Sequence, residues 1–121
     1  MVDFRPSQVS GTVTSTSTQE AILAEGTDTA VAANTLTTLV SFTMTIANKD
    51  ITRISCSGEF YAKFDIFVNT VRRETQRSGP SRNVDFTFQN FVFSVGDVVD
   101  VKVTHAYTGK TPEFNATIYG F

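Results

Sequence analysis

Apolar and polar residues alternate along most of this chain, and the clearest alternation follows a glycine–aspartate pair. In the stretch FVFSVGDVVDVKVTHAY (91–107), two apolar runs meet at Gly96 and Asp97. Successive side chains of a strand point to opposite faces, so the second run predicts a half-buried strand with a solvated outer face. Glycine tolerates positive φ and aspartate bonds nearby backbone, so the pair predicts a tight turn. The residues predicted to face inward are Val99, Val101, Val103, His105 and Tyr107, and those predicted to face outward are Asp100, Lys102, Thr104 and Ala106.

The same kind of alternation predicts further strands, separated by turn residues. Residues 20–34 predict a short strand, a turn and a second short strand near 30–32. Asn69 and Thr70 predict a two-residue hairpin turn, with a longer loop as the alternative because threonine suits the second position poorly. At Gln89 and Asn90 the phase of the alternation slips, which predicts a bulge or a bend where a strand crosses between sheets. The remaining predicted strands are 35–46 (with Leu36, Thr38, Val40, Phe42, Met44 and Ile46 on one face), 51–60, a strand through Phe64, Ile66 and Val68 (with Lys63, Asp65 and Asn69 outward), 83–88, and 114–121.

Many short strands without a long helix predict an all-β protein. We expect a jelly-roll-like antiparallel β-sandwich of about eight strands. An immunoglobulin-like sandwich is disfavoured because the chain has one cysteine and no tryptophan. Residues 20–121 are predicted to form a single β-sandwich domain. Residues 1–19, rich in serine and threonine, are predicted to be an extended or mobile N-terminal arm, either disordered or docked on a neighbouring subunit through Phe4 and Arg5.

Composition and charge narrow the class of protein. Of the 121 residues only 18% are charged, and the net charge is −2. A nucleic-acid-binding protein needs a basic stripe, so nucleic acid is not an expected partner. No run of residues approaches the length of about 18 apolar residues that a membrane helix requires, and the N-terminus lacks a signal-peptide pattern. We therefore expect a soluble chain made in a reducing compartment, with its one cysteine, Cys56, buried and unreactive.

No catalytic, cofactor-binding or metal-binding residue is predicted. His105 lies on the valine face of its strand and is expected to be a hydrogen-bonded structural side chain rather than a base, since no G-x-S-x-G motif accompanies it. Asp97 and Asp100 suggest turn and outer-face roles, because they do not gather the six to eight oxygens that Ca²⁺ takes. Sugar binding usually uses an exposed aromatic platform, and the absence of tryptophan weakens that interpretation.

The most polar segment, 71–82, carries a group of arginines. It contains Arg72, Arg73, Arg77 and Arg82 beside Glu74 and is predicted to be a loop. One interpretation is a solvated loop whose charge pairs contribute little. The other is contact with an acidic protein surface, because the arginine fork pairs carboxylates in two places at once.

From Val31 to its end the chain resembles the small jelly-roll virion proteins of tailed bacteriophages. The resemblance is carried by 35–46, FDIFVN (64–69), SRNVDFTF (81–88), SVGDVVDVKVTH (94–105) and FNATIYGF (114–121), although Asn69 is followed by threonine where glycine is expected. It implies a non-enzymatic capsid decoration (cement) protein, made in the host cytoplasm and located on the capsid surface. The implied partners are the major capsid protein and further copies of the chain in a dimer or trimer, without a cofactor. The alternative is a carbohydrate-binding or adaptor module of a phage tail or baseplate, with a glycan ligand less favoured than a protein partner. The candidate partner-binding residues are Phe4, Arg5, Arg72, Arg73, Arg77 and Arg82.

Overall fold

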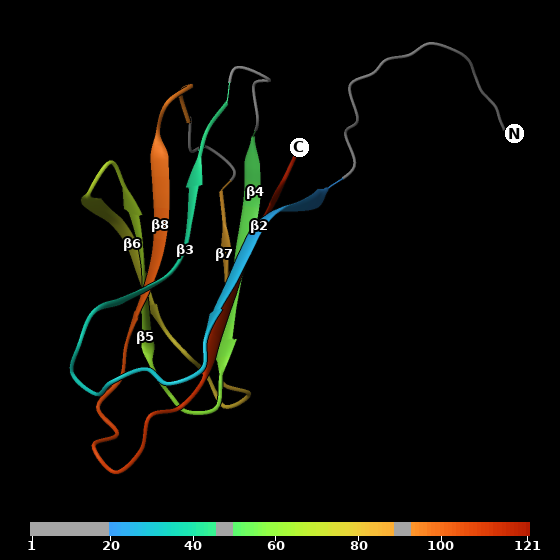
Figure 1. Cartoon of the computed structure of the whole chain (residues 1–121). Coiled ribbons are helices and arrows are strands. Elements are labelled where there is room, and N and C mark those ends of the chain that lie inside the picture. The colour runs from blue at the N-terminus through green and yellow to red at the C-terminus, as the bar shows by residue number, and fades with distance from the viewer. Residues whose placement is uncertain (1–19, 46–49, 89–92) are drawn as a thin grey trace, which may run out of the picture.

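Two antiparallel sheets of four strands pack face to face in the computed structural model, which describes residues 20–45, 50–88 and 93–121 (Figure 1). The all-β sandwich prediction is confirmed, and no helix occurs in the described ranges. The predicted arm of residues 1–19 and the phase slip at Gln89 and Asn90 lie outside the described residues. The strands are β2 (Ala21–Asp28), β3 (Thr37–Thr43), β4 (Ile51–Gly58), β5 (Lys63–Val68), β6 (Val71–Arg77), β7 (Asn83–Thr87), β8 (Val98–Thr104) and β9 (Phe114–Gly120).

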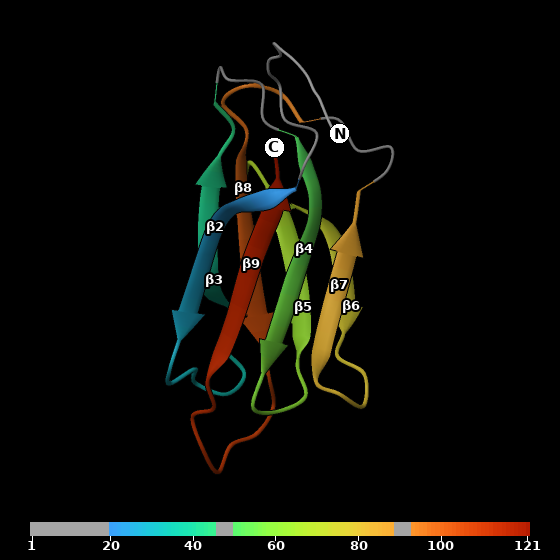
Figure 2. The ribbon, with the colours of Figure 1, turned by 90° about the vertical axis from the view of Figure 1, so that its right-hand side faces the viewer.

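The strand pairing follows one simple rule along the chain. β5 pairs with β6 in a hairpin, and outward from that hairpin β4 pairs with β7, β3 with β8 and β2 with β9. Two further pairings, β4 with β9 and β5 with β8, close this long folded hairpin into two sheets. The strand orders are β2-β9-β4-β7, seen in front in Figure 2, and β3-β8-β5-β6. Every connection except the β5–β6 turn therefore crosses from one sheet to the other.

The core lies between the sheets and is filled by large side chains from both. Phe64 of β5 and Phe114 of β9 meet edge to face across the sandwich, with ring centroids 6.0 Å apart. Phe86 of β7 is buried as well. The predicted inward row is confirmed for Val99, Val101, Val103 and His105, which are all buried. It is wrong for Tyr107, which lies beyond the end of β8 and is 36% exposed.

The predicted facing of residues 35–46 is wrong in its first half. Leu36 is 44% exposed and Thr38 is also exposed, whereas Leu39 and Val40 are both buried. The cause is a β-bulge, since Thr38 pairs with Lys102 and Val40 with Val101, which leaves Leu39 as an extra residue. A bulge shifts the alternation by one residue, so the two halves of the segment follow opposite phases.

The predicted second strand at 30–32 does not form. The Asp28 side chain accepts a hydrogen bond from the Ala30 N–H at 3.0 Å, a local turn that takes the chain away from the end of β2. The N–H of the buried Val31 then donates to the Pro112 carbonyl at 3.0 Å. Val31 is thus bound to the β8–β9 connection rather than to a strand ladder.

The turn formed by residues 94–97 holds the upper end of the sandwich together, as viewed in Figure 1. Gly96 has φ +93°, and the Asp97 N–H donates to the Ser94 carbonyl, so the predicted tight turn is confirmed. The Asp97 carboxylate accepts from the Ser94 N–H at 2.8 Å and from the Asn69 amide at 2.9 Å, and these donors lower the pKa of the Asp97 carboxyl. The backbone groups of Gly96 and Asp97 bond those of Met44, which follows β3.

The β5–β6 connection is the predicted two-residue hairpin turn. Val68 pairs with Val71, and the two residues between them, Asn69 and Thr70, have φ of 51° and 69°. Positive φ at both central positions matches the twist of the flanking strands. Asparagine tolerates this conformation, but for a β-branched residue such as Thr70 it is strained.

We expect Thr70→Gly to raise the free energy of unfolding by about 0.5–1 kcal/mol. Left-handed backbone costs a residue with a side chain about 1–2 kcal/mol, and the larger unfolded-state entropy of glycine cancels part of that gain. Urea unfolding of the two proteins measures the difference. Gly96→Ala is the opposite change and should lower the free energy of unfolding. No atom lies within 4 Å of the added Cβ, so the expected effect comes from the strain of a side chain at φ +93°. A loss of stability in Thr70→Gly contradicts this account of the turn.

Candidate functional site

The first part of the arginine segment forms a strand, so the prediction of a loop is wrong for residues 71–77, whereas residues 78–82 do form the connection to β7. Val71–Arg77 is β6, an edge strand that pairs only with β5 and in which all seven residues are exposed. Because both faces of this strand meet solvent, its sequence does not alternate, and no apolar pattern marks it. Arg72, Arg73 and Arg77 belong to β6, and Arg82 lies exposed in the connection to β7.

Two of these arginines, Arg72 and Arg77, lie on the outer face of their sheet. The register shifts between Ile66 and Phe67, so that Arg72 pairs with Phe67 while Arg77 pairs with Lys63. Arg73 is the extra residue of this irregularity and lies near the Asp97 carboxylate, whose pKa it helps to lower. The arginine side chains of β6 therefore do not all lie on the same side of the strand.

Asp65, predicted to face outward into solvent, is fully buried. Its register on β5, between Lys102 of β8 and Thr75 of β6, still places it on the outer face of the sheet. Neighbouring side chains cover it. Thr75 donates its hydroxyl hydrogen bond to Asp65 Oδ1, and Arg72 Nε lies 3.3 Å from the same oxygen, while Oδ2 has no partner among the described residues.

The Phe67 ring contacts Arg72 as well, together with a second cation, Lys102. The Arg72 guanidinium lies 5.4 Å and the Lys102 ammonium 4.6 Å from the centre of the Phe67 ring. Cations at these distances are attracted by the electron-rich face of an aromatic ring. The Arg72 side chain therefore contacts residues of its own sheet, Asp65 and Phe67. In contrast, Arg77 and Arg82 form no ion pair with any described residue.

The remaining two candidate residues, Phe4 and Arg5, lie outside the described residues. Their predicted role in an arm that docks on a neighbour stays a prediction. In the part of the chain that the structure describes, the candidate partner-binding residues all lie on β6 or in the connection that follows it.

His105 and Cys56 have the structural environments predicted for them. His105 Nε2 lies 2.7 Å from the Val31 carbonyl, and Nδ1 accepts a hydrogen bond from the Tyr107 N–H at 3.0 Å. Both ring nitrogens are therefore occupied when the ring is neutral and protonated at Nε2. Cys56 is fully buried, and that burial, with a smaller effect of Asp85, raises the pKa of its thiol to about 12.

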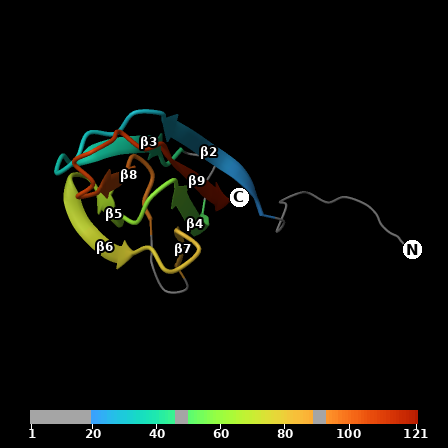
Figure 3. The same cartoon turned by 90° about the horizontal axis from the view of Figure 1, so that it is seen from below.

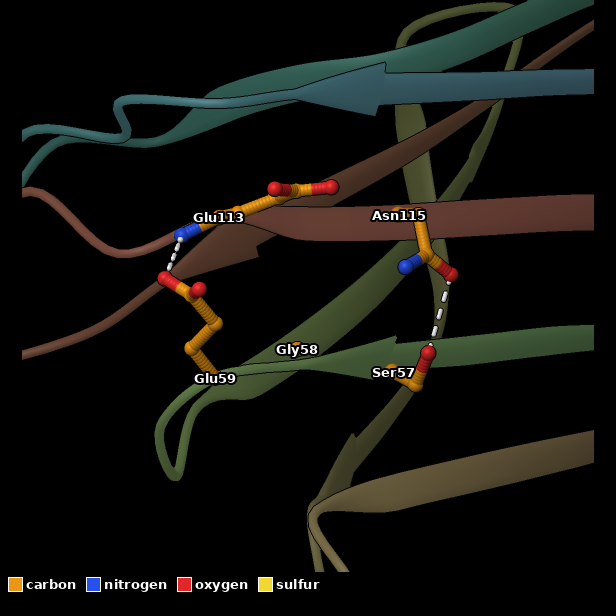
Figure 4. Close-up of a pocket in the computed structure, with 5 residues that line it drawn as sticks. All are labelled: Ser57, Gly58, Glu59, Glu113 and Asn115. Carbon is orange, nitrogen blue, oxygen red and sulfur yellow. Dashed lines mark hydrogen bonds between the residues drawn. The ribbon is translucent and has the colours of Figure 1, made fainter.

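Acidic residues also gather at the end of β4 and the start of β9 (Figure 4). Glu59, Glu113, Ser57 and Asn115 line a small pocket of about 260 Å³. Glu59 Oε1 accepts a hydrogen bond from the Glu113 backbone N–H at 2.9 Å, and Ser57 donates its hydroxyl to Asn115 Oδ1 at 2.9 Å. These bonds link the end of β4 to the start of β9. Within residues 20–45, 50–88 and 93–121, no three His, Cys, Asp or Glu side chains lie close enough to share a metal ion.

An aromatic cluster at the lower end of the sandwich was not predicted. The Phe60 and Tyr107 rings stack with centroids 4.4 Å apart, and the Tyr61 ring meets Phe60 edge to face at 5.9 Å. Tyr61 is 49% exposed. These rings come from the β4–β5 and β8–β9 connections, which meet at the same end of the molecule, so no spacing in the sequence indicates their contact (Figure 1).

Comparison with known proteins identifies no relative of this chain. No family model matches the chain, and neither a curated protein nor a solved structure matches it. Among the described residues, none belongs to a helix that could span a membrane.

We expect Arg72→Ala to lower the free energy of unfolding by about 1–3 kcal/mol, because the buried Asp65 carboxylate then loses its charged partner. Arg77→Ala is the matched control on the same strand and the same face. Since Arg77 has no carboxylate partner among the described residues, its removal should change stability by less than about 0.5 kcal/mol. Equal effects of the two substitutions, measured by urea unfolding, would show that the Asp65–Arg72 pair contributes nothing.

Proposed function

We propose that this chain is a non-enzymatic structural protein of a phage virion, a capsid decoration protein that binds the outer shell through the β6 edge. The observation that carries the attachment is that β6 is an edge strand exposed along its whole length, with three arginines and one glutamate. The virion setting is what the resemblance in residues 31–121 implies. The shell surface it would meet is an acidic patch of the major capsid protein.

The strand order supports a jelly roll, the fold that the resemblance implies. Jelly rolls are double-sheet sandwiches of eight strands. Here four nested pairs, from β5–β6 at the centre to β2–β9 at the ends, are rolled into two sheets. Such a scaffold leaves edge strands and end loops as its surfaces for binding. Among the edge strands of the described sheets, β6 has the most charged residues.

The charges on this edge suit a protein partner. Arginine pairs carboxylates in a planar, two-point geometry, and it retains its charge at any physiological pH. Arg77 and Arg82 form no ion pair with described residues, so an acidic partner need not displace a carboxylate of those residues. A dimer or trimer of the chain would repeat this edge around a symmetry axis of the shell.

The second candidate function is a carbohydrate-binding or adaptor module of a phage tail or baseplate. It is favoured by the exposed Tyr61 and Tyr107, which provide the aromatic surface that sugar binding uses. In this alternative the lower end of the sandwich, rather than the β6 edge, is the working surface.

Sedimentation with shells tests the attachment. The full chain is mixed with shells of the parent particle that lack it, and binding is measured at rising salt. We expect affinity to fall steeply as salt rises from about 50 to about 500 mM, because attraction between exposed charges is screened. The double variant Arg77→Gln/Arg82→Gln should bind at least about tenfold more weakly.

Lys110→Gln removes a positive charge outside β6 and serves as the control. It should bind the shells as the unmodified chain does. Salt-independent binding, or full binding by the double variant, contradicts attachment through the β6 edge. Binding to tails and not to shells contradicts the capsid assignment.

A further inference from the structure

An open pocket of about 470 Å³ lies at the lower end of the β3-β8-β5-β6 sheet, where loops from both sheets meet. Its walls come from the β4–β5 connection, the ends of β6 and β8, and the loop before β3. Figure 3 shows the molecule from below, with these segments together at the end that faces the viewer. The lining residues are Asn34, Tyr61, Ala62, Lys63, Arg77, Ser78, Thr104, His105 and Ala106.

Among the described residues that line this pocket, the two charged side chains, Lys63 and Arg77, are both positive. Lys63 pairs in register with Arg77 on one side and with Thr104 on the other. Like charges directly opposite on neighbouring strands repel and destabilise the sheet. Neither cation forms an ion pair with a described residue, and no carboxylate lines the pocket. A bound anion would relieve this repulsion.

The pocket also has an aromatic wall, which a simple anion would not use. The Tyr61 ring is 49% exposed and meets Phe60 edge to face, and Phe60 in turn stacks on Tyr107. A flat, rigid ring of this kind covers the apolar face of a sugar, and its hydroxyl remains available for a hydrogen bond.

Hydrogen bonds hold the pocket in shape and leave other polar groups available. The Ala62 and Ser78 segments are joined by the Ser78 N–H to the Ala62 carbonyl at 2.9 Å and by the Ala62 N–H to the Ser78 hydroxyl at 2.8 Å. His105 is held by its two ring nitrogens. In contrast, the Asn34 amide and the Thr104 hydroxyl bond no described residue, so both can serve sugar hydroxyls.

We propose that this pocket binds an acidic saccharide, with the sugar ring against Tyr61 and its carboxylate between Lys63 and Arg77. The aromatic wall alone would accept a neutral sugar, and the two cations alone would accept any small anion. An acidic sugar satisfies both at once. This inference depends on neither the shell attachment nor the edge arginines at 72, 73 and 82.

Titration calorimetry of the full chain tests the proposal with four probes of different chemistry. The probes are a trimer of galacturonic acid, a sialylated trisaccharide, the neutral disaccharide lactose and inorganic sulfate. We expect at least one acidic saccharide to bind at least about tenfold more tightly than lactose and sulfate do. Equal binding of sulfate would reveal a simple anion site, equal binding of lactose a neutral sugar site, and no binding of either acidic saccharide an unused pocket. Each of these results overturns the proposal.

Variants then locate the site. Lys63→Gln and Tyr61→Ala should each weaken binding of the acidic saccharide by at least about tenfold, because they remove the carboxylate contact and the ring contact separately. Lys110→Gln removes the same charge from an exposed position outside the pocket and should leave binding unchanged. If Lys63→Gln or Tyr61→Ala folds normally and binds as the unmodified chain does, the assignment to this pocket is wrong. Arg77 is left unchanged throughout, so that a result here is separate from the test of shell attachment.

Discussion

The turn of residues 94–97 fixes where β8 begins, and much of the sandwich depends on that position. Its backbone is bonded to Met44 after β3, and its Asp97 carboxylate is bonded to Asn69 in the β5–β6 turn. β8 pairs with both β3 and β5, so these bonds set the register of three strands together. A slip of one residue would turn the buried valines outward and carry Asp100 and Lys102 into the core.

The inward and outward residues of a strand are predicted most reliably where one face of the strand is buried and the other is exposed to solvent. β8 and β9 both alternate without interruption, and the inward valines of β8 agree with the sequence prediction. The prediction failed at Leu39, where a bulge shifts the phase, and at β6, where both faces are exposed and nothing alternates. Burial of Asp65 could not be predicted either, because it arises from side chains that only the strand pairing brings over it.

The two proposed binding surfaces could be predicted from the sequence even less well than the strands. The arginines of segment 71–82 were identified by composition alone, but their division between a structural pair at Asp65 and exposed positions on the edge depends on register. The pocket at the lower end depends on the pairing of Lys63 with Arg77 and on the contact of Tyr61 with Phe60, which are made by strand register and by a loop. The two proposed surfaces, the charged β6 edge and the aromatic, cationic lower end, therefore adjoin each other at Arg77, the last residue of β6.

The proposed attachment to a phage shell through the β6 edge is tested most directly by electron cryomicroscopy of the parent particle, at a resolution that traces the chain. We expect density for the sandwich on the outer surface of the capsid, with β6 and Arg82 facing acidic residues of the capsid subunits. A map that places the sandwich in the tail or baseplate, or on the capsid with β6 turned to solvent, contradicts it.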